Sequence, residues 1–161
     1  MKLSTRAEYG IRALIELALQ YEHKTDQPLM LQVIAGRQDI SKKYLEQLFI
    51  PLRKAGVVEG VRGPSGGYRL SRPPKEIHLD EVFEVLEGSL SVADCLDAPT
   101  MCKHSGGCAT QEVWRQISRA IEETLGAISL SDLLARHSCL VQRLQSLSAL
   151  GPEKSLDCAE A

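Results

Sequence analysis

Three of the chain's five cysteines lie close together in one short polar segment. The segment is DCLDAPTMCKHSGGCATQEVW, residues 94–114, and its thiols, Cys95, Cys102 and Cys108, follow the spacing C-x6-C-x5-C. The segment contains proline and glycine between the cysteines, and its apolar residues are few, which is typical of a loop. Three thiols do not pair off into disulfides, and they are one ligand short of a four-coordinate metal site.

Three interpretations of this loop are open. Structural thiols or a disulfide are the first, although buried structural cysteines usually lie on apolar stripes. Zinc is the second, but zinc sites usually contain two cysteines separated by two to four residues, and the sequence has no such pair. An iron–sulfur cluster is the third, because its irons take thiolates with an occasional substitute such as histidine. Lys103 and His104 add positive charge, which favours the thiolate form.

The composition predicts one globular domain, or one domain with an extension. The chain has 161 residues, of which 43% are hydrophobic. No apolar run approaches the roughly 20 residues of a membrane helix, and the N-terminus lacks a signal-peptide core. We therefore expect a cytoplasmic protein without membrane contact, in which cysteines are thiols or metal ligands.

Charge is strongly segregated along the chain although the net charge is only −2. Residues 41–75 contain eight Lys/Arg and two Asp/Glu, whereas residues 76–161 contain six Lys/Arg and fourteen Asp/Glu. Such a basic segment is either a solvated face or the electrostatic footprint of an anionic partner.

The first half has the element order of a winged helix-turn-helix. Thr5 and Glu8 fit a capping box that starts a helix, and a short helix is expected over 31–37. Ser41 caps a third helix, which Gly56 ends. Two alternating runs, 57–61 and 67–71, flank a Gly/Pro turn and predict a hairpin. The predicted fold is mainly α with a small β-hairpin, and the DNA-binding domain spans residues 1–75.

The second half is predicted to contain the cysteine loop and the helices that form the dimer interface. A helix is expected over 79–86, stopped by Gly88, and a long helix over 110–124. The long helix has an apolar stripe with little left in the chain to cover it, so we expect a partner protomer there. A short helix is expected over 132–136. Residues 76–137 would form this region, with 138–161 as a flexible tail in which neither Cys139 nor Cys158 has an assigned role.

The start of the capped third helix is suited to DNA. In a helix-turn-helix protein this end of the recognition helix enters the major groove, where lysines contact phosphate. Glu46 and Gln47 lie one turn into this helix and can reach base edges. A glutamate can accept a hydrogen bond from the cytosine amino group, and a glutamine can pair with adenine. Alternatively, Glu46 is simply an exposed neighbour of Lys42 and Lys43.

The hairpin tip is suited to the same partner. Small residues let a backbone approach phosphates or the minor groove, and Arg62 supplies the charge that enters it. By itself the tip is equally a plain turn, but its place directly after a basic capped helix favours DNA binding.

These residues resemble a known family. The stretch SKKYLEQLFIPLRKAGVVEGVRGPSGGYRL and the opening MKLSTRAEYGIRAL are similar to the winged-helix regulators that include the iron–sulfur cluster regulator IscR, the nitric-oxide sensor NsrR and the cysteine-metabolism repressor CymR. The resemblance covers roughly residues 1–137 and implies a homodimer that binds a partly palindromic double-stranded DNA operator. The implied DNA contacts are Ser41, Lys43, Tyr44, Glu46 and Gln47 on the helix, and Arg62, Gly63, Ser65, Gly66 and Gly67 on the wing.

The resemblance also favours a cluster, since cluster-binding members carry three cysteines in this place. It implies Cys95, Cys102 and Cys108 as metal ligands and a 2Fe-2S cluster, with 4Fe-4S as the alternative. The histidine that completes the site in the iron–sulfur cluster regulator is replaced here by Gln111. Glu8, donated by the other protomer as in some relatives, or His104 within the loop is therefore the expected fourth ligand.

The expected function is a transcription regulator whose operator binding depends on an iron–sulfur cluster and so responds to redox state or iron. A cluster-free repressor controlled by a metabolite or a partner protein is the alternative. An iron–sulfur or zinc carrier without DNA binding is disfavoured by the basic segment. No catalytic constellation stands out, and we expect no enzyme.

Overall fold

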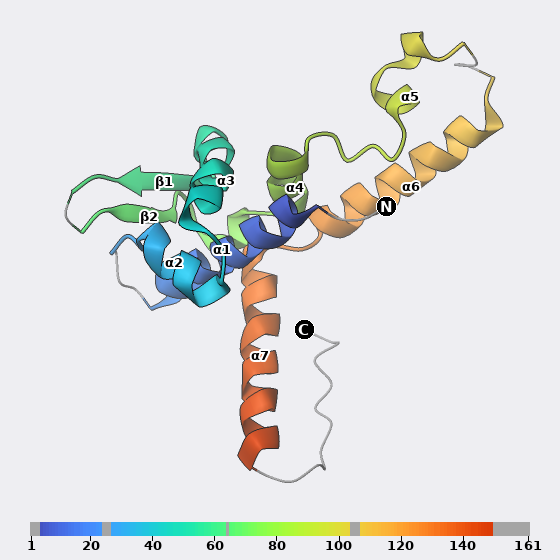
Figure 1. Ribbon diagram of the computed structural model, residues 1–161. Helices are drawn as coiled ribbons and strands as arrows, with labels where there is room; N and C mark the ends of the chain where they lie inside the picture. Colours follow the sequence, from blue (N-terminus) through green and yellow to red (C-terminus); the bar gives the residue numbers. More distant parts are fainter. Residues whose placement is uncertain (1–3, 24–26, 64, 104–106, 150–161) are drawn as a thin grey trace.

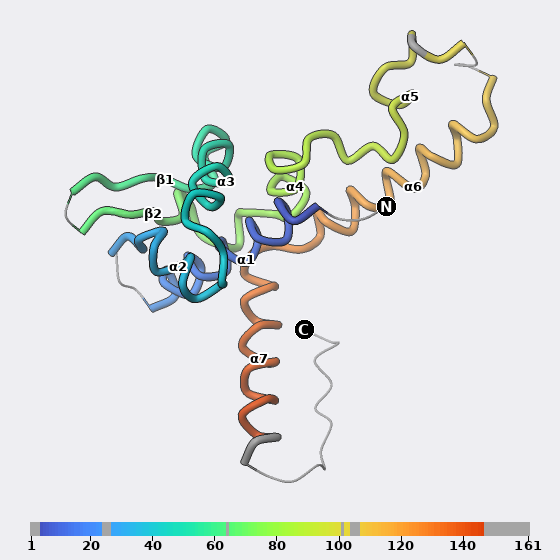
Figure 2. The backbone as a smooth tube through the Cα atoms, in the orientation of Figure 1, coloured from blue at the N-terminus to red at the C-terminus, as the bar shows by residue number. Residues whose placement is uncertain are grey.

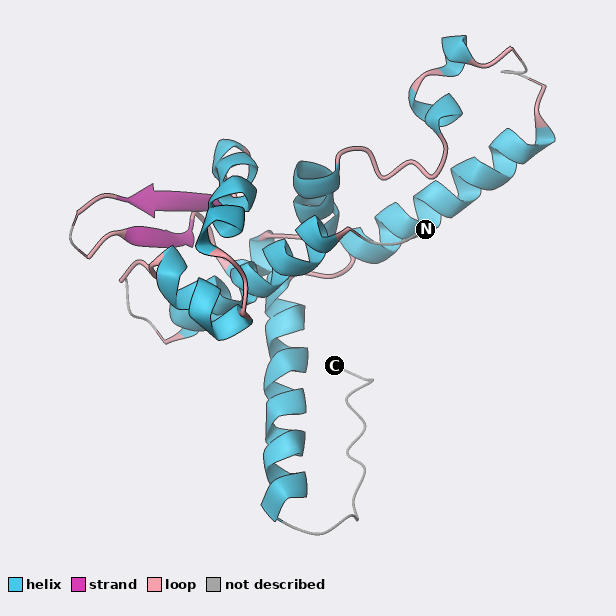
Figure 3. Cartoon of the chain, viewed as in Figure 1, coloured by secondary structure: helices cyan, strands magenta, loops and turns pink. Residues whose placement is uncertain are grey.

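The computed structural model describes residues 4–23, 27–63, 65–103 and 107–149. Its helices are α1 (Thr5–Glu22), α2 (Leu31–Gln38), α3 (Lys42–Lys54), α4 (Leu79–Glu87), α5 (Asp94–Asp97), α6 (Ala109–Gly126) and α7 (Leu130–Ala149). Two 3₁₀ turns, η1 (Pro74–Glu76) and η2 (Pro99–Met101), lie between them. The strands β1 (Val58–Val61) and β2 (Gly67–Leu70) form one antiparallel hairpin (Figure 3). The predicted fold class is confirmed.

The core lies where the first three helices meet the hairpin and α4. Leu14 and Leu17 of α1, with Leu48 and Phe49 of α3, are fully or almost fully buried there. α7 begins in the same core, because Leu130 and Leu134 are also buried. Burying such side chains contributes roughly 1.5–3 kcal/mol each, so this cluster is the main source of stability.

The N-cap of helix α1 lies one residue earlier than predicted. Ser4, not Thr5, is the N-cap, and its hydroxyl accepts a hydrogen bond from the Arg6 N–H at 3.0 Å. The predicted capping box with Glu8 is wrong, since Glu87 of α4 accepts instead from the Ala7 N–H at 2.9 Å and from the Ser4 hydroxyl. The carboxylate that accepts from the Ala7 N–H thus lies 80 positions away in the sequence, so no local sequence pattern reveals it.

Helix α3 follows its sequence signals closely. The Ser41 hydroxyl accepts from the Tyr44 N–H at 3.1 Å, as expected of an N-cap. Beyond the helix Gly56 adopts φ +73°, a left-handed conformation that glycine tolerates. The short turn between α2 and α3 is made by Asp39, also left-handed with φ 52°.

The C-terminal half departs from the compact core. α6 runs outward from α4 and carries the cysteine loop at its distal end, while α7 leaves the core in another direction (Figures 1 and 2). The predicted short helix over 132–136 is wrong, because it is part of the 20-residue α7. Residues 138–149, expected within a flexible tail, are therefore helical.

Candidate nucleic-acid interface and cysteine loop

The predicted recognition residues share the outer side of α3. Ser41, Lys43, Glu46 and Gln47 are exposed, while Tyr44 is half-buried. The buried stripe of the same helix, Leu45, Leu48, Phe49 and Leu52, faces the core and fixes this orientation. The carboxylate of Glu46 lies 3.7 Å from the Lys42 ammonium, an exposed i,i+4 pair that contributes little to stability. This pair fits the alternative interpretation of Glu46.

Tyr44 is tied to the first turn of α1. Its hydroxyl oxygen lies 3.2 Å from the Thr5 hydroxyl. Its ring packs edge-on against Tyr9, with the ring centroids 6.0 Å apart. The first turns of α1 and α3 are thus in direct contact, and a displacement of one acts on the other.

The wing is anchored to the rest of the domain at its second strand. Leu29, just before α2, exchanges two backbone hydrogen bonds of 2.9 Å with Tyr68. The Tyr68 ring also packs against Phe49 of α3, with centroids 4.8 Å apart. The hairpin and α3 therefore have a fixed relative position.

The tip of the wing separates into exposed and constrained residues. Arg62, Gly63 and Ser65 are exposed, whereas Gly66 and Gly67 are half-buried. A Cβ on Gly66 would lie 2.5 Å from the Val61 carbonyl oxygen, and one on Gly67 would lie 2.4 Å from that of Leu29. These two glycines are required by the packing of the wing itself, whatever the wing contacts. Pro64 lies outside the described residues.

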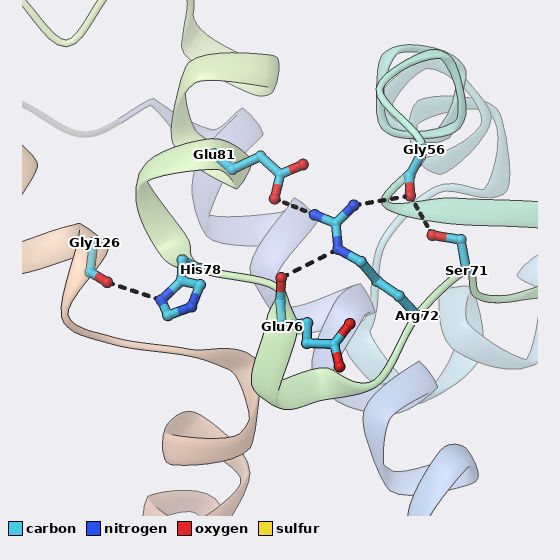
Figure 4. Close-up of polar contacts among 7 residues, drawn as sticks. All are labelled: Gly56, Ser71, Arg72, Glu76, His78, Glu81 and Gly126. Carbon is cyan, nitrogen blue, oxygen red and sulfur yellow. Dashed lines mark hydrogen bonds and ion pairs between the residues drawn. The ribbon is translucent and has the colours of Figure 1, made fainter.

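Arg72 joins the end of α3 to α4, as Figure 4 shows. Its guanidinium donates to the Gly56 carbonyl, which follows α3, at 3.4 Å, and to the Glu76 carbonyl at 3.1 Å, and it pairs with the Glu81 carboxylate of α4. Next to it, the His78 ring nitrogen Nδ1 lies 2.8 Å from the carbonyl of Gly126 at the end of α6 (Figure 4). A short series of polar contacts thus links the end of α3 to α4 and α6.

The three cysteines of the loop are free, half-buried thiols. Cys95 lies on α5, Cys102 follows η2, and Cys108 is the N-cap residue of α6. The Thr110 hydroxyl, 2.9 Å from the Cys108 sulfur, and the backbone N–H of Gln111 lower the pKa of the Cys108 thiol. The Cys108 thiol therefore ionises more readily than an ordinary cysteine, and the thiolate is the form that acts as a nucleophile or a metal ligand.

Gln111, at the position of the expected histidine, has a structural partner. Its side chain is 8% exposed, and its amide nitrogen donates to the Cys95 carbonyl oxygen at 3.3 Å. In the sequence Gln111 stands only where a histidine ligand is missing, and this contact was not predicted. No local signal indicates it, because a polar side chain is expected to be exposed unless the segment that covers it is known.

Of the two expected fourth ligands, the structure describes Glu8, which is not grouped with the thiols within one chain. The Glu8 carboxylate is about half exposed and pairs with Arg12 of its own helix at 3.3 Å. His104 lies outside the described residues. Over residues 4–23, 27–63, 65–103 and 107–149, no three His, Cys, Asp or Glu side chains stand close enough together to hold a metal ion. In the same part of the chain, no helix combines the length and apolarity that crossing a bilayer requires.

Comparison with curated proteins finds transcription regulators. A 41% identical relative from Azotobacter vinelandii, "Putative HTH-type transcriptional regulator ORF2", aligns over 84% of this chain and 80% of its own length. The "HTH-type transcriptional regulator IscR" of Aliivibrio salmonicida is 40% identical over 83% of this chain and 77% of its own.

Solved structures of similar fold carry related names. The cysteine regulator CymR of B. subtilis is 36% identical, with a TM-score of 0.68 over 83% of this chain and 96% of its own. IscR of T. potens is 35% identical, with a TM-score of 0.65 over 98% of this chain and 94% of its own.

The family comparison covers most of the sequence. A model of the Rrf2 family, described as "Iron-dependent Transcriptional regulator", matches residues 3–136. The relatives are named as transcriptional regulators, a family not known for catalysis. The resemblance found in the sequence is confirmed, and the chain belongs to the Rrf2 family of transcriptional regulators.

Proposed function

We propose that this regulator is a homodimer that binds an operator through α3 and the wing, and that an iron–sulfur cluster held by Cys95, Cys102 and Cys108 controls this binding. The observation that carries the proposal is the combination, in one chain of the Rrf2 family, of an exposed recognition face with three free thiols on one loop. The name IscR on several relatives supports it.

The donor set fits the cluster chemically. Thiolates are the usual ligands of iron–sulfur clusters, and all three loop thiols are free and partly accessible. Such a cluster, when bound, supplies a centre that responds to oxidants and to iron supply. Glu8 of a second copy, or His104, would complete the ligand set, whereas Gln111 is already engaged with the Cys95 carbonyl.

The surface of α6 supports the homodimer. Val113, Trp114 and Ile117 are 49%, 40% and 39% exposed, although they are large apolar side chains. Beside them lies a cavity of about 570 Å³ lined mainly by apolar residues, among them Phe83, Leu90, Ile121 and Leu125. A second copy of the chain that lays its own α6 on this face would cover both.

The chain contains contacts that can carry a change at the loop to the DNA-reading face. Glu8 lies on the first turn of α1, where Thr5 and Tyr9 contact Tyr44 of the recognition helix. At the other end of α3, Arg72 connects Gly56 to Glu81 of α4, on which α6 packs. A displacement of α1 or α4 relative to the core would therefore alter both ends of α3.

A cluster-free repressor is the second candidate. The specific observation in its favour is that the described residues bring no three metal-ligating side chains together. Likeness to the CymR structure is compatible with it as well.

Anaerobic preparation separates the two candidates. We expect the wild-type protein to contain iron and acid-labile sulfide in equal amounts and to absorb in the visible range. A variant with all three loop cysteines changed to serine should contain neither. A colourless wild-type protein without iron or sulfide, prepared with the same care, would contradict cluster control and favour the second candidate.

A further inference from the structure

The segment that carries Cys95 rests on α6 through hydrogen bonds from two buried polar side chains. Of the residues of α6, all of which the structure describes, two are buried, and both are polar: Gln111 and Ser118, which are 8% and 5% exposed. Each bonds to the backbone of residues 92–95. Ser118 accepts from the Val92 N–H at 3.1 Å, and the Gln111 amide donates to the Cys95 carbonyl at 3.3 Å.

The spacing of the two side chains explains how they act together. Seven residues are close to two turns of helix, so Gln111 and Ser118 lie on one side of α6, one above the other. Val113, Trp114 and Ile117 of the same helix are exposed, and Ile121 and Leu125 are half-buried. The two buried side chains that hold the segment on α6 are therefore polar, where those of a packing helix would be expected to be apolar.

The same segment is also tied to the end of α4. Asp97 accepts hydrogen bonds from the hydroxyls of Ser89 and Ser91, at 2.8 and 2.7 Å. These serines follow Gly88, which ends α4 with φ 90°. Cys95 thus stands on a short helical turn between the end of α4 and the buried side of α6.

We propose that Gln111 and Ser118 are positioning residues that dock the Cys95 segment on α6 and so set the placement and accessibility of the Cys95 thiol. The inference deepens the proposed function by giving Gln111 a role in presenting a ligand, in place of the direct ligation a histidine would provide. It concerns the metal-free chain, and it holds or fails independently of whether a cluster binds.

The chemistry at Gln111 makes the docking specific. The side-chain nitrogen is the donor, because the carbonyl of Cys95 only accepts. Glutamate has nearly the same shape as glutamine, but as a carboxylate it has no proton to donate. Gln111→Glu therefore removes this hydrogen bond without creating a cavity, whereas Gln111→Ala removes the whole side chain.

The test measures how fast each thiol reacts in the reduced, metal-free, full-length protein. Iodoacetamide labelling is followed by peptide mass spectrometry, which separates Cys95, Cys102 and Cys108. We expect Gln111→Glu and Ser118→Ala to raise the labelling rate of Cys95, relative to Cys102 in the same sample, about fivefold, the factor for one net hydrogen bond. The rate at Cys108 should stay near its wild-type value, because the backbone N–H of Gln111 and the Thr110 hydroxyl remain in place.

The matched control is Gln116→Ala, the same residue type on an exposed position of the same helix. It should leave all three rates unchanged. A second readout, hydrogen exchange of the peptide containing residues 92–97, should quicken in Ser118→Ala, since the Val92 N–H loses its acceptor. Circular dichroism shows whether each variant is folded. If Gln111→Ala does not fold, Gln111→Glu still tests the role of the hydrogen bond to Cys95.

The outcomes separate the two proposals. An unchanged Cys95-to-Cys102 labelling ratio in folded Gln111→Glu and Ser118→Ala would overturn the docking role, even where wild-type protein holds a cluster. A selective rise at Cys95, together with an anaerobically prepared wild-type protein that contains no iron or sulfide, would support the docking and contradict only cluster control.

Discussion

The Tyr44 hydroxyl lies 3.2 Å from the hydroxyl of Thr5, so the first turn of α3 is bonded to the first turn of α1. Edge-on contact between Tyr9 and Tyr44 adds to this link. On the same turn of α1, Ala7 is held by Glu87 of α4. The N-terminal part of α1 therefore contacts both α3 and α4.

The Thr5–Tyr44 contact should be measurable as a coupling energy. We expect Thr5→Ala and Tyr44→Phe each to lower the free energy of unfolding slightly, and the double variant to lower it by less than their sum. Because the contact is exposed, the coupling should be on the order of 0.5 kcal/mol. Urea denaturation of the four proteins measures it, and strictly additive effects would contradict a direct hydrogen bond.

Arg62 should contribute a charge contact to DNA that depends on salt. A pool of DNA duplexes, randomised over roughly two helical turns, first yields a bound sequence for the wild-type protein. Arg62→Ala should then weaken binding and reduce the slope of log affinity against log salt concentration by about one. Arg53→Ala, on the last turn of α3, serves as a basic control. Equal affinity and slope in wild type and Arg62→Ala would remove the wing from the interface.

The exposed side of α6 should govern assembly. Ile117→Glu places a charge on a 39% exposed apolar position and should convert the proposed dimer into a monomer, because burying an unpaired carboxylate in an interface is strongly unfavourable. Sedimentation equilibrium measures the mass. Glu112→Gln, exposed on the same helix, is the control and should remain dimeric. A monomeric wild-type protein, or a dimeric Ile117→Glu variant, would exclude this surface as the dimer interface.

Much of the DNA-reading half was predictable because its signals are local. Ser41 caps α3, Gly56 ends the last turn, and the hairpin runs on both sides of a Gly/Pro turn, all within a few residues of the sequence signal. The capping box of α1 was misassigned because Ser4 is the N-cap and Glu87 of α4, not Glu8, supplies the carboxylate, and contacts over such a separation leave no local pattern. Gln111 and Ser118 were missed for the same reason: polar side chains predict an exposed surface unless the segment that covers them is known.

The start of α7 gives a prediction about pH. Ser129 and Asp132 cap each other: the Ser129 N–H and hydroxyl donate to the Asp132 carboxylate at 2.8 and 2.6 Å, and the Asp132 N–H donates to the Ser129 hydroxyl at 3.2 Å. The hydroxyl and backbone N–H of Ser129 lower the pKa of Asp132. A lowered folded-state pKa means that this stabilisation is present above the unfolded pKa of about 3.9 and is lost as pH falls through the folded value.

Variants of this pair should show that dependence. Ser129→Ala should cost about 1 kcal/mol of unfolding free energy at pH 7, as expected for a lost N-cap. Asp132→Asn should be less stable than wild type at pH 7, and the difference should shrink as the pH falls below about 4. Thermal denaturation at several pH values measures both, and a difference that grows toward acid pH would contradict the assignment.

The most direct measurement of the central claim is operator affinity of one preparation with and without its metal centre. DNA binding by anaerobic wild-type protein is compared with that of the same protein after chelation, and with the variant in which Cys95, Cys102 and Cys108 are serine. The account predicts that chelation changes wild-type affinity for at least one selected duplex by roughly tenfold, about 1.4 kcal/mol. It also predicts that the serine variant binds like the chelated protein and does not respond to the chelator. Equal affinity of all three for every selected duplex would contradict control of DNA binding by the cysteine loop.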